Sequence, residues 1–222
     1  MLNSPKIIYQ SEKTSIFFEE KNEFETATVI KTLNSEYPEA QELTQFSNEY
    51  KILKDLDLEG VRKVYKKEQR NKKNALILEY VEGEDLKKYF KNRLKIDLFL
   101  EIAIQISHTL GQIHQQNIVH KDFHSNNILV NKENKVKVID FDISAKVDYK
   151  TQTLASSDRL EGTLDYISPE QTGRMNRLVD GRSDLYSLGV SFYEILASQL
   201  PFLSKDPMEI VHSHIAKKPT SL

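Results

Sequence analysis

The chain has 222 residues, of which 29% are charged and 39% hydrophobic, and its formal net charge is −2. This near-neutral balance gives no electrostatic case for nucleic acid or an anionic membrane as the main partner. The absence of cysteine excludes a disulfide framework and a thiolate zinc site, and no apolar run approaches the ~20 residues of a membrane span. Residues 1–10 lack the apolar stretch of a signal peptide, so a cytoplasmic location is expected.

Short strands and one helix are predicted for the first third of the chain. Pro38 is expected in the first turn of a helix that runs to about Leu56, because the missing N–H of proline costs nothing there. Gly60 follows this helix as a stop signal. Strands are predicted where β-branched and aromatic residues are common, at 7–9, 15–18, 27–33, 61–65 and 75–81.

The pattern becomes helical from Leu86 onward. Apolar residues recur at helical spacing between Leu98 and His114, and a last clear helix is expected at about 184–196. Short strands are predicted at 118–119, 128–130 and 136–140, followed by a long irregular segment at about 144–169. Strands first and helices later, with the acidic hinge 82–85 between them, predict an α+β fold with two lobes.

Two loop segments carry residues suited to phosphate chemistry. Asp122 and Asn127 lie between the long helix and a strand, where Asp122 could accept a hydroxyl proton and Asn127 could bind a metal through its amide oxygen. Asp140 ends an apolar strand and could bind Mg²⁺, a hard cation that prefers oxygen ligands. Taken alone, an aspartate after a strand is more often a turn or cap residue.

Lys31 and Glu49 form a second candidate constellation. In a helix, Glu49 shares one stripe with apolar residues three, four and seven positions away, at 52, 53 and 56. A carboxylate on such a stripe is costly unless it is paired, and a lysine from an adjoining strand, such as Lys31, would pair it. The alternatives are a solvated lysine at a sheet edge and a glutamate at the rim of the stripe that is bonded to water.

In this order, the residues resemble the protein kinase signature. That signature has a strand lysine, a helix glutamate, an H-x-D-x-x-x-x-N loop, a D-F-x triplet and an x-P-E motif. The chain supplies Lys31, Glu49, His120 to Asn127, Asp140-Phe141 and Ser168-Pro169-Glu170, with Gly162-Thr163, 184–189 and 200–202 in matching positions. Residues 162–177 further resemble the N-terminal kinase-like domain of large bacterial signalling proteins, which continue into an ATPase-type module, sensor domains and often a histidine kinase.

The resemblance implies a two-lobed protein-kinase-like fold, with an antiparallel sheet and one helix in the N-lobe and a mainly helical C-lobe. Residues 1–81 would form the N-lobe, and residues 82–222 the hinge and part of the C-lobe. It also implies phosphoryl transfer from ATP, with Mg²⁺, to serine or threonine hydroxyls of an unidentified protein substrate. The chain is then expected to be one domain of a longer polypeptide.

The resemblance also implies a role for each matching residue. Lys31, held by Glu49, would contact the α- and β-phosphates, while Asn127 and Asp140 would bind Mg²⁺. Asp122 would accept the proton of the attacking hydroxyl, and Thr163 would help to fix the catalytic loop. The remaining nucleotide contacts are expected from the hinge residues Glu79 and Val81, from Leu78 behind the adenine, and from the phosphate-loop residues Ser11 and Ser15.

The chain departs from the kinase pattern at several positions. The phosphate loop at 10–15 has no glycine, and Asp142 replaces the glycine of the D-F-G triplet. Lys121 replaces an arginine whose planar fork grips a phosphoresidue, so weak dependence on activation-loop phosphorylation is expected. His124 stands where serine/threonine kinases carry a lysine. With this histidine, the loop from His120 to Asn127 also resembles the catalytic loop of small-molecule kinases. An active protein kinase is therefore weighed against a nucleotide-binding pseudokinase and a small-molecule phosphotransferase.

Overall fold

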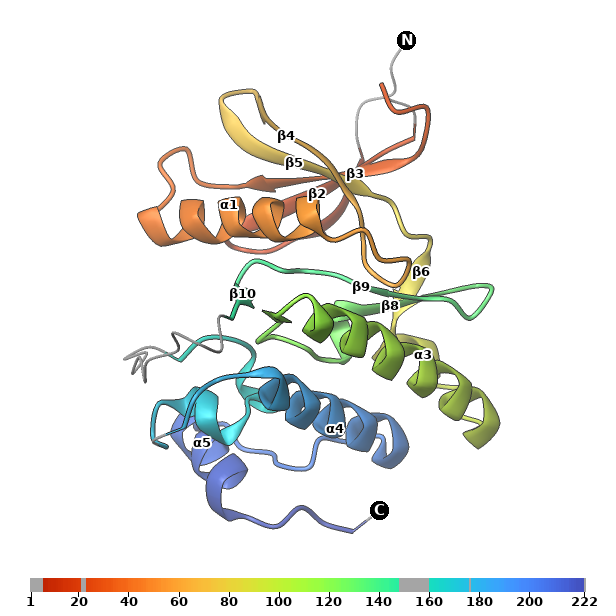
Figure 1. Ribbon diagram of the computed structural model, residues 1–222, viewed down its shortest axis with the longest axis vertical. Coiled ribbons are helices and arrows are strands. Elements are labelled where there is room, and N and C mark those ends of the chain that lie inside the picture. The colour runs from red at the N-terminus through yellow and green to blue at the C-terminus, as the bar shows by residue number, and fades with distance from the viewer. Residues whose placement is uncertain (1–5, 21–22, 148–159, 176, 222) are drawn as a thin grey trace.

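The computed structural model describes residues 6–20, 23–147, 160–175 and 177–221. A sheet with one helix beneath it forms the upper part of the molecule, and the longer helices lie in the lower part (Figure 1). The predicted two-lobed α+β fold is thus confirmed. The elements of the upper part are β1 (Lys6–Gln10), β2 (Thr14–Glu19), β3 (Thr28–Leu33), α1 (Ala40–Asp55), β4 (Val64–Arg70) and β5 (Lys73–Glu79).

The upper sheet is antiparallel and has the strand order β1-β2-β3-β5-β4. Its central strand β3 is buried along its whole length, which suits its β-branched sequence. Lys31 lies in this strand, in register with Ile16 of β2 and Leu76 of β5. The sheet therefore fixes the position of a lysine that is itself buried.

Two boundaries in the upper part differ from the sequence prediction. Helix α1 begins at Ala40, so Pro38 precedes the helix and does not lie in its first turn. The strand predicted at 61–65 is β4, which starts later and pairs with β5 through a tight turn at Asn71 and Lys72, where φ is 49° and 63°. Strand β4 is an edge strand with several charged residues, so its bounds could not be predicted from an apolar run in the sequence.

The lower part is built around two helices, α3 (Ile96–Gln115) and α4 (Gly181–Ala197). Ile102, Ile106, Leu110 and Ile113 form the buried stripe of α3, as the helical spacing predicted. Around them lie β6 (Gly83–Asp85), α2 (Leu86–Phe90), β7 (Ile118–Val119), β8 (Ile128–Asn131), β9 (Val136–Val138), β10 (Ala145–Lys146) and α5 (Pro207–Ala216), with short 3₁₀ helices at Ser125–Asn127, Leu164–Tyr166 and Pro169–Thr172.

Helix α4 begins earlier than predicted, and its buried side carries several polar residues. Asp180 caps its first turn by accepting a hydrogen bond from the N–H of Arg182. Its buried residues include Ser183, Ser187 and Ser191, whereas Leu185 is 55% exposed. Helix α5 was not predicted, although Asp206 caps it and Pro207 occupies its first position.

The two parts are joined at two places. The chain crosses once through residues 80–83, between β5 and β6. A second connection is made by hydrogen bonds: Val138 donates from its N–H to the carbonyl of Gly60 at 2.8 Å, and Arg62 donates from its N–H to the carbonyl of Val138 at 3.0 Å. One continuous apolar core runs through both parts. A cleft opens between them.

Candidate active site

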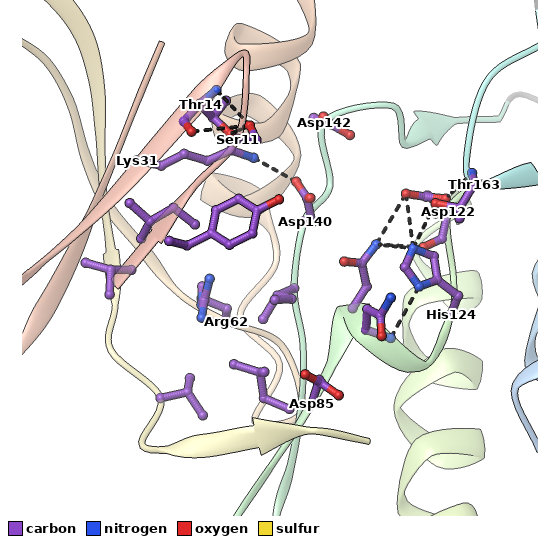
Figure 2. Close-up of a pocket in the computed structure, with 18 of the residues that line it drawn as sticks. Ser11, Thr14, Lys31, Arg62, Asp85, Asp122, His124, Asp140, Asp142 and Thr163 are labelled. Atoms are coloured by element: carbon purple, nitrogen blue, oxygen red, sulfur yellow. Dashed lines mark hydrogen bonds and ion pairs between the residues drawn. The ribbon is translucent and has the colours of Figure 1, made fainter. Parts of the chain in front are cut away.

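The cleft has a volume of about 1180 Å³ and is walled by residues from both parts of the molecule. Figure 2 shows Lys31, Ser11 and Thr14 at the upper left of the view and Asp122, His124 and Thr163 at the right, with Asp140 and Asp142 between them. These residues come from strand β3, from the turn that leads into β2 and the start of β2, from the loops around β7–β9, and from the segment just before the 3₁₀ helix at Leu164–Tyr166. The fold therefore gathers groups that are separated by more than 100 positions in the sequence.

Lys31 is the central cation of the cleft. Its Nζ donates to Oε2 of Glu49 at 2.7 Å and to Oδ1 of Asp140 at 2.7 Å. Burial disfavours the charged form of Lys31, but Asp140 and Glu49 outweigh burial and raise its pKa above the ordinary value. Lys31 is therefore a permanent cation, and the predicted pairing of Glu49 with a lysine from the sheet is confirmed.

Asp140 has a backbone conformation uncommon for a residue with a side chain. Its φ is 67°, and the φ of Lys121 in the facing loop is 66°. Such strain concentrates at functional sites, where the surrounding structure enforces it. Asp140 is followed by Phe141, which is fully buried and lies 4.6 Å from the ring of His120 between ring centroids. The apolar anchoring of Phe141 holds the carboxylate of Asp140 at the cleft.

His120 is a neutral structural residue. Its Nδ1 accepts a hydrogen bond from the N–H of Asp122 at 3.3 Å, so Nε2 carries the proton and donates to the carbonyl of Ile139 at 3.1 Å. Burial lowers the pKa of His120, which agrees with this assignment. His120 thereby ties the Asp122 loop to the residue that precedes Asp140.

Asp122 lies in a network that orients its carboxylate. Its Oδ1 accepts from the N–H of Thr163 at 2.7 Å, and its Oδ2 lies 3.4 Å from Nε2 of His124. Burial raises the pKa of Asp122, but the contacts with His124 and the Thr163 N–H outweigh burial and leave its pKa below the ordinary value. Asn127 donates from Nδ2 to the carbonyl of Asp122 at 3.0 Å. Asp122 is therefore ionised and held in place.

Asp184, whose role the sequence reasoning missed, anchors this loop from helix α4. Its Oδ2 accepts from the N–H of His120 and its Oδ1 from the N–H of Lys121, each at 2.8 Å, and Nε2 of His114 lies 2.8 Å from Oδ2. Asp184 is 1% exposed. The sequence alone does not show that this face of α4 is buried, so it does not mark Asp184 as a buried carboxylate that needs hydrogen-bond donors.

Asn48, next to Glu49 on α1, was also missed. Its Nδ2 donates to the carbonyls of Asp142 at 3.0 Å and Ser144 at 2.7 Å. This side chain links the helix that carries Glu49 to the segment that follows Asp140. The link forms through main-chain carbonyls, which leave no pattern in the sequence.

Asp142 adds a second carboxylate beside Asp140. Burial, and then the negative charge of Asp140, raise the pKa of Asp142 to about 7. Both carboxylates line the cleft. The aspartate in place of a glycine therefore changes the charge of the site and not only the freedom of the backbone.

The turn above Lys31 is closed by its own hydrogen bonds. Thr14 donates from its N–H to Oγ of Ser11 at 3.0 Å, and Asn34 donates from Nδ2 to the carbonyl of Ser11 at 2.8 Å. Ser11 and Thr14 line the cleft. Ser15, expected at the nucleotide, instead donates from Oγ to Oδ1 of Asn34 at 2.6 Å, because neighbouring residues in a strand point to opposite faces.

The predicted hinge residues lie at the end of β5 and beyond it. Leu78 is 1% exposed and lies behind the cleft wall. Glu79 directs its carboxylate away to Lys137, which donates from Nζ at 3.0 Å, and Val81 lines the cleft. The N–H of Glu79 donates to the carbonyl of Lys63 at 2.9 Å, so of these hinge residues it is Val81 that faces the cleft.

The segment at 160–172 lies against the loop that carries Asp122. Gln171 donates from Nε2 to the carbonyl of Lys121 at 2.6 Å. Gly162 has a φ of 95°, and a side chain there would meet the same carbonyl at 3.0 Å, so glycine is required. Nζ of Lys121 lies 3.8 Å from Oε2 of Glu161, a carboxylate supplied by the chain itself. Residues 148–159 lie outside the described part of the chain.

Comparison with known proteins identifies the family. The protein kinase domain family matches residues 14–221. A probable serine/threonine-protein kinase of Clostridium perfringens is 32% identical over 192 residues, which cover 85% of this chain and 27% of that protein. Serine/threonine-protein kinase PknA of Corynebacterium glutamicum is 32% identical over 201 residues, which cover 87% of this chain and 42% of that protein.

A further relative is much longer than this chain. Hybrid signal transduction histidine kinase G of Dictyostelium discoideum is 32% identical over 195 residues, which cover 57% of this chain and 6% of that protein. The chain thus spans less than half the length of each of these three relatives. None of its helices, within the described ranges, is both long and apolar enough to cross a membrane. The chain belongs to the protein kinase domain family.

Proposed function

We propose that this chain transfers the γ-phosphoryl group of ATP to serine or threonine hydroxyls of a protein substrate in signal transduction. The observation that carries the proposal is the arrangement across one cleft of Lys31, bound to Glu49 and Asp140, and the oriented pair Asp122 and Asn127. Phosphoryl transfer depends mainly on positioning and on electrostatic stabilisation, and these residues supply both. Residues 1–81 would act as the N-lobe and 82–222 as the hinge and partial C-lobe.

Asp140 and Asn127 fit a Mg²⁺ ion. Asn127 directs its NH₂ group to Asp122, so its amide oxygen accepts no hydrogen bond from the described residues. Asp140 uses one carboxylate oxygen for Lys31 and keeps the other. The described ranges contain no group of three or more histidine, cysteine or carboxylate side chains gathered for a metal, so phosphates and water would complete the shell. When bound, Mg²⁺ would neutralise charge on the phosphates.

The chain's own residues account for the rest of the reaction. Lys31 would contact the α- and β-phosphates, and main-chain groups of Glu79 and Val81 would receive the adenine in front of Leu78. Ser11, at the mouth of the turn, would lie over the phosphates. Asp122 would orient the substrate hydroxyl and take its proton on the carboxylate, which is ionised because its pKa is low.

Thr163 connects this base to the substrate-facing segment. Its N–H holds Oδ1 of Asp122, and its Oγ1 lies 3.1 Å from Nε2 of His124. The ordered segment at 160–172 supports a protein acceptor over a small molecule, because it builds a wall beside the base against which a peptide can lie. The proposal places the chain in the cytoplasm, where ATP is available, as one domain of a longer protein like its relatives.

The test is transfer of labelled γ-phosphate from Mg-ATP to a generic acceptor protein and to the chain itself. Asp122→Asn should abolish transfer and leave ADP binding intact, because the amide keeps the shape but cannot take the proton. Asp97→Asn, on the exposed first turn of α3, is the matched control and should leave transfer unchanged. Binding of ATP with no transfer by the unaltered protein would instead favour a pseudokinase.

A further inference from the structure

Arg62 is a cation of the cleft that the proposed mechanism does not use. It follows Val61, which forms an isolated bridge with Val138, and its own N–H donates to the carbonyl of Val138 at 3.0 Å. This main-chain anchor fixes the start of the side chain, which lines the cleft. Figure 2 shows Arg62 in the interior of the pocket, between Lys31 and Asp140 above it and Asp85 below.

The guanidinium of Arg62 has no partner among the described residues. Its Nε is buried and makes no hydrogen bond within the described part of the chain. The three carboxylates whose charges act on it are Glu49, Asp140 and Glu79. Each of them is already paired with another cation: Glu49 and Asp140 with Lys31 at 2.7 Å, and Glu79 with Lys137 at 3.0 Å.

An arginine in this position is costly to the protein on its own. Burial lowers the pKa of Arg62, and the neighbouring carboxylates only partly oppose this effect. Arginine remains charged at all physiological pH values, so the cost cannot be avoided by loss of a proton. Arg62 is half-buried, but its Nε is buried without a partner, and a ligand in the cleft can supply that partner.

We propose that Arg62 is a nucleotide-binding residue that donates hydrogen bonds to the phosphate groups of the bound nucleotide. The guanidinium lies in the field of Glu49 and Asp140, the same carboxylates that hold Lys31, and so it belongs to the phosphate half of the cleft. Its planar fork of N–H donors matches phosphate oxygens. This inference rests on the proposed function, since it assumes that the cleft binds a nucleotide.

The proposal also explains how a turn without glycine can serve a phosphate site. The hydroxyl groups of Ser11 and Thr14 are hydrogen-bonded to each other, and the N–H of Thr14 donates to Oγ of Ser11. Lys31 is shared between two carboxylates. A second cation from below the phosphates would supply the donors that the turn above them does not.

The test compares Arg62→Met with Arg62→Lys by calorimetric titration of ADP and of adenosine, and by thermal melting without ligand. Methionine keeps the unbranched apolar stem of the side chain and removes the charge and the donors, while lysine keeps the charge and loses the fork. We expect Arg62→Met to weaken ADP binding about 10- to 100-fold and to leave adenosine binding within about twofold. The same variant should raise the Tm of the free protein, because it removes a half-buried cation whose Nε has no partner. Arg62→Lys should fall between the two in ADP affinity.

Three results would overturn the inference. Unchanged ADP affinity in Arg62→Met would show that the phosphates do not meet the guanidinium. Equal loss of affinity for ADP and for adenosine would show that Arg62 contacts the adenosine part of the nucleotide and not the phosphates. A lower Tm without ligand would show that the arginine stabilises the fold itself. If the unaltered protein binds ADP but transfers no phosphate, the proposed function is refuted, and the ADP titrations of the Arg62 variants still test the role of Arg62.

Discussion

Replacement of Asp184 by asparagine tests whether one buried carboxylate holds the catalytic loop. Its two oxygens accept separate main-chain N–H groups, from His120 on Oδ2 and from Lys121 on Oδ1. An amide has one oxygen, so in either orientation its NH₂ faces one of these N–H donors. The variant loses one charge-assisted hydrogen bond, leaves a buried donor unpaired and weakens the remaining bonds, at a total cost of about 2–4 kcal/mol.

The expected Tm is lower by roughly 5–15 °C for a chain of this size. Phosphate transfer should fall at least about tenfold while ADP affinity stays within about threefold, because the loop that carries Asp122 shifts and Lys31 does not. Asp180→Asn is the matched control: this side chain caps the same helix from an exposed ion pair with Arg182, and asparagine caps helices equally well. Thermal melting and transfer assays measure both variants. A Tm change under about 2 °C in Asp184→Asn would refute the reasoning.

Three further predictions follow from single contacts. Asp142→Asn should raise the Tm in Mg²⁺-free buffer at pH 8 and do so less at pH 5. The folded-state pKa of about 7 lies above the ordinary 3.8, so the ionised carboxylate destabilises the fold fully above pH 7, progressively less as the pH falls toward 3.8, and not at all below pH 3.8. An equal gain at both pH values would contradict this. Asn48→Ala should lower the Tm by a few degrees and weaken Mg-ADP binding in titrations, since it removes the donor to two carbonyls behind Asp140, at about 1–2 kcal/mol; unchanged binding would separate α1 from the metal site. Glu161 already places a carboxylate near Lys121, so phosphate transfer should not require a phosphorylated residue there. Transfer should therefore be unchanged after alanine replacement of four hydroxyl residues, Thr151, Thr153, Ser156 and Ser157. Loss of transfer in that variant would refute this prediction.

The parts of the site that follow from pairing rules could be predicted from the sequence. A glutamate on an apolar helix stripe requires a cation, and Lys31 provides it at 2.7 Å. The long helix α3 follows from the spacing of its isoleucines and leucines. Both predictions depend on side chains, whose burial has a period that can be read in the sequence.

The missed features depend on contacts between side chains and main chain. Asp184 and Asn48 bind N–H and carbonyl groups, which every residue carries, so no pattern in the sequence marks them. Strand β4 was misplaced because an edge strand needs no apolar run. Ser15 was expected at the ligand, but the start of β2 puts Thr14 on that face and turns Ser15 to Asn34.

The double attachment between the upper and lower parts has a mechanical consequence. Two fixed points, the crossing at residues 80–83 and the hydrogen bonds of Gly60 and Arg62 to Val138, define an axis of rotation. A swing about that axis would carry the Ser11 turn through the widest arc, while Arg62 and the chain leading to Asp140 would hardly separate. The mouth of the cleft could then admit and release a nucleotide while the charges at its base keep their spacing.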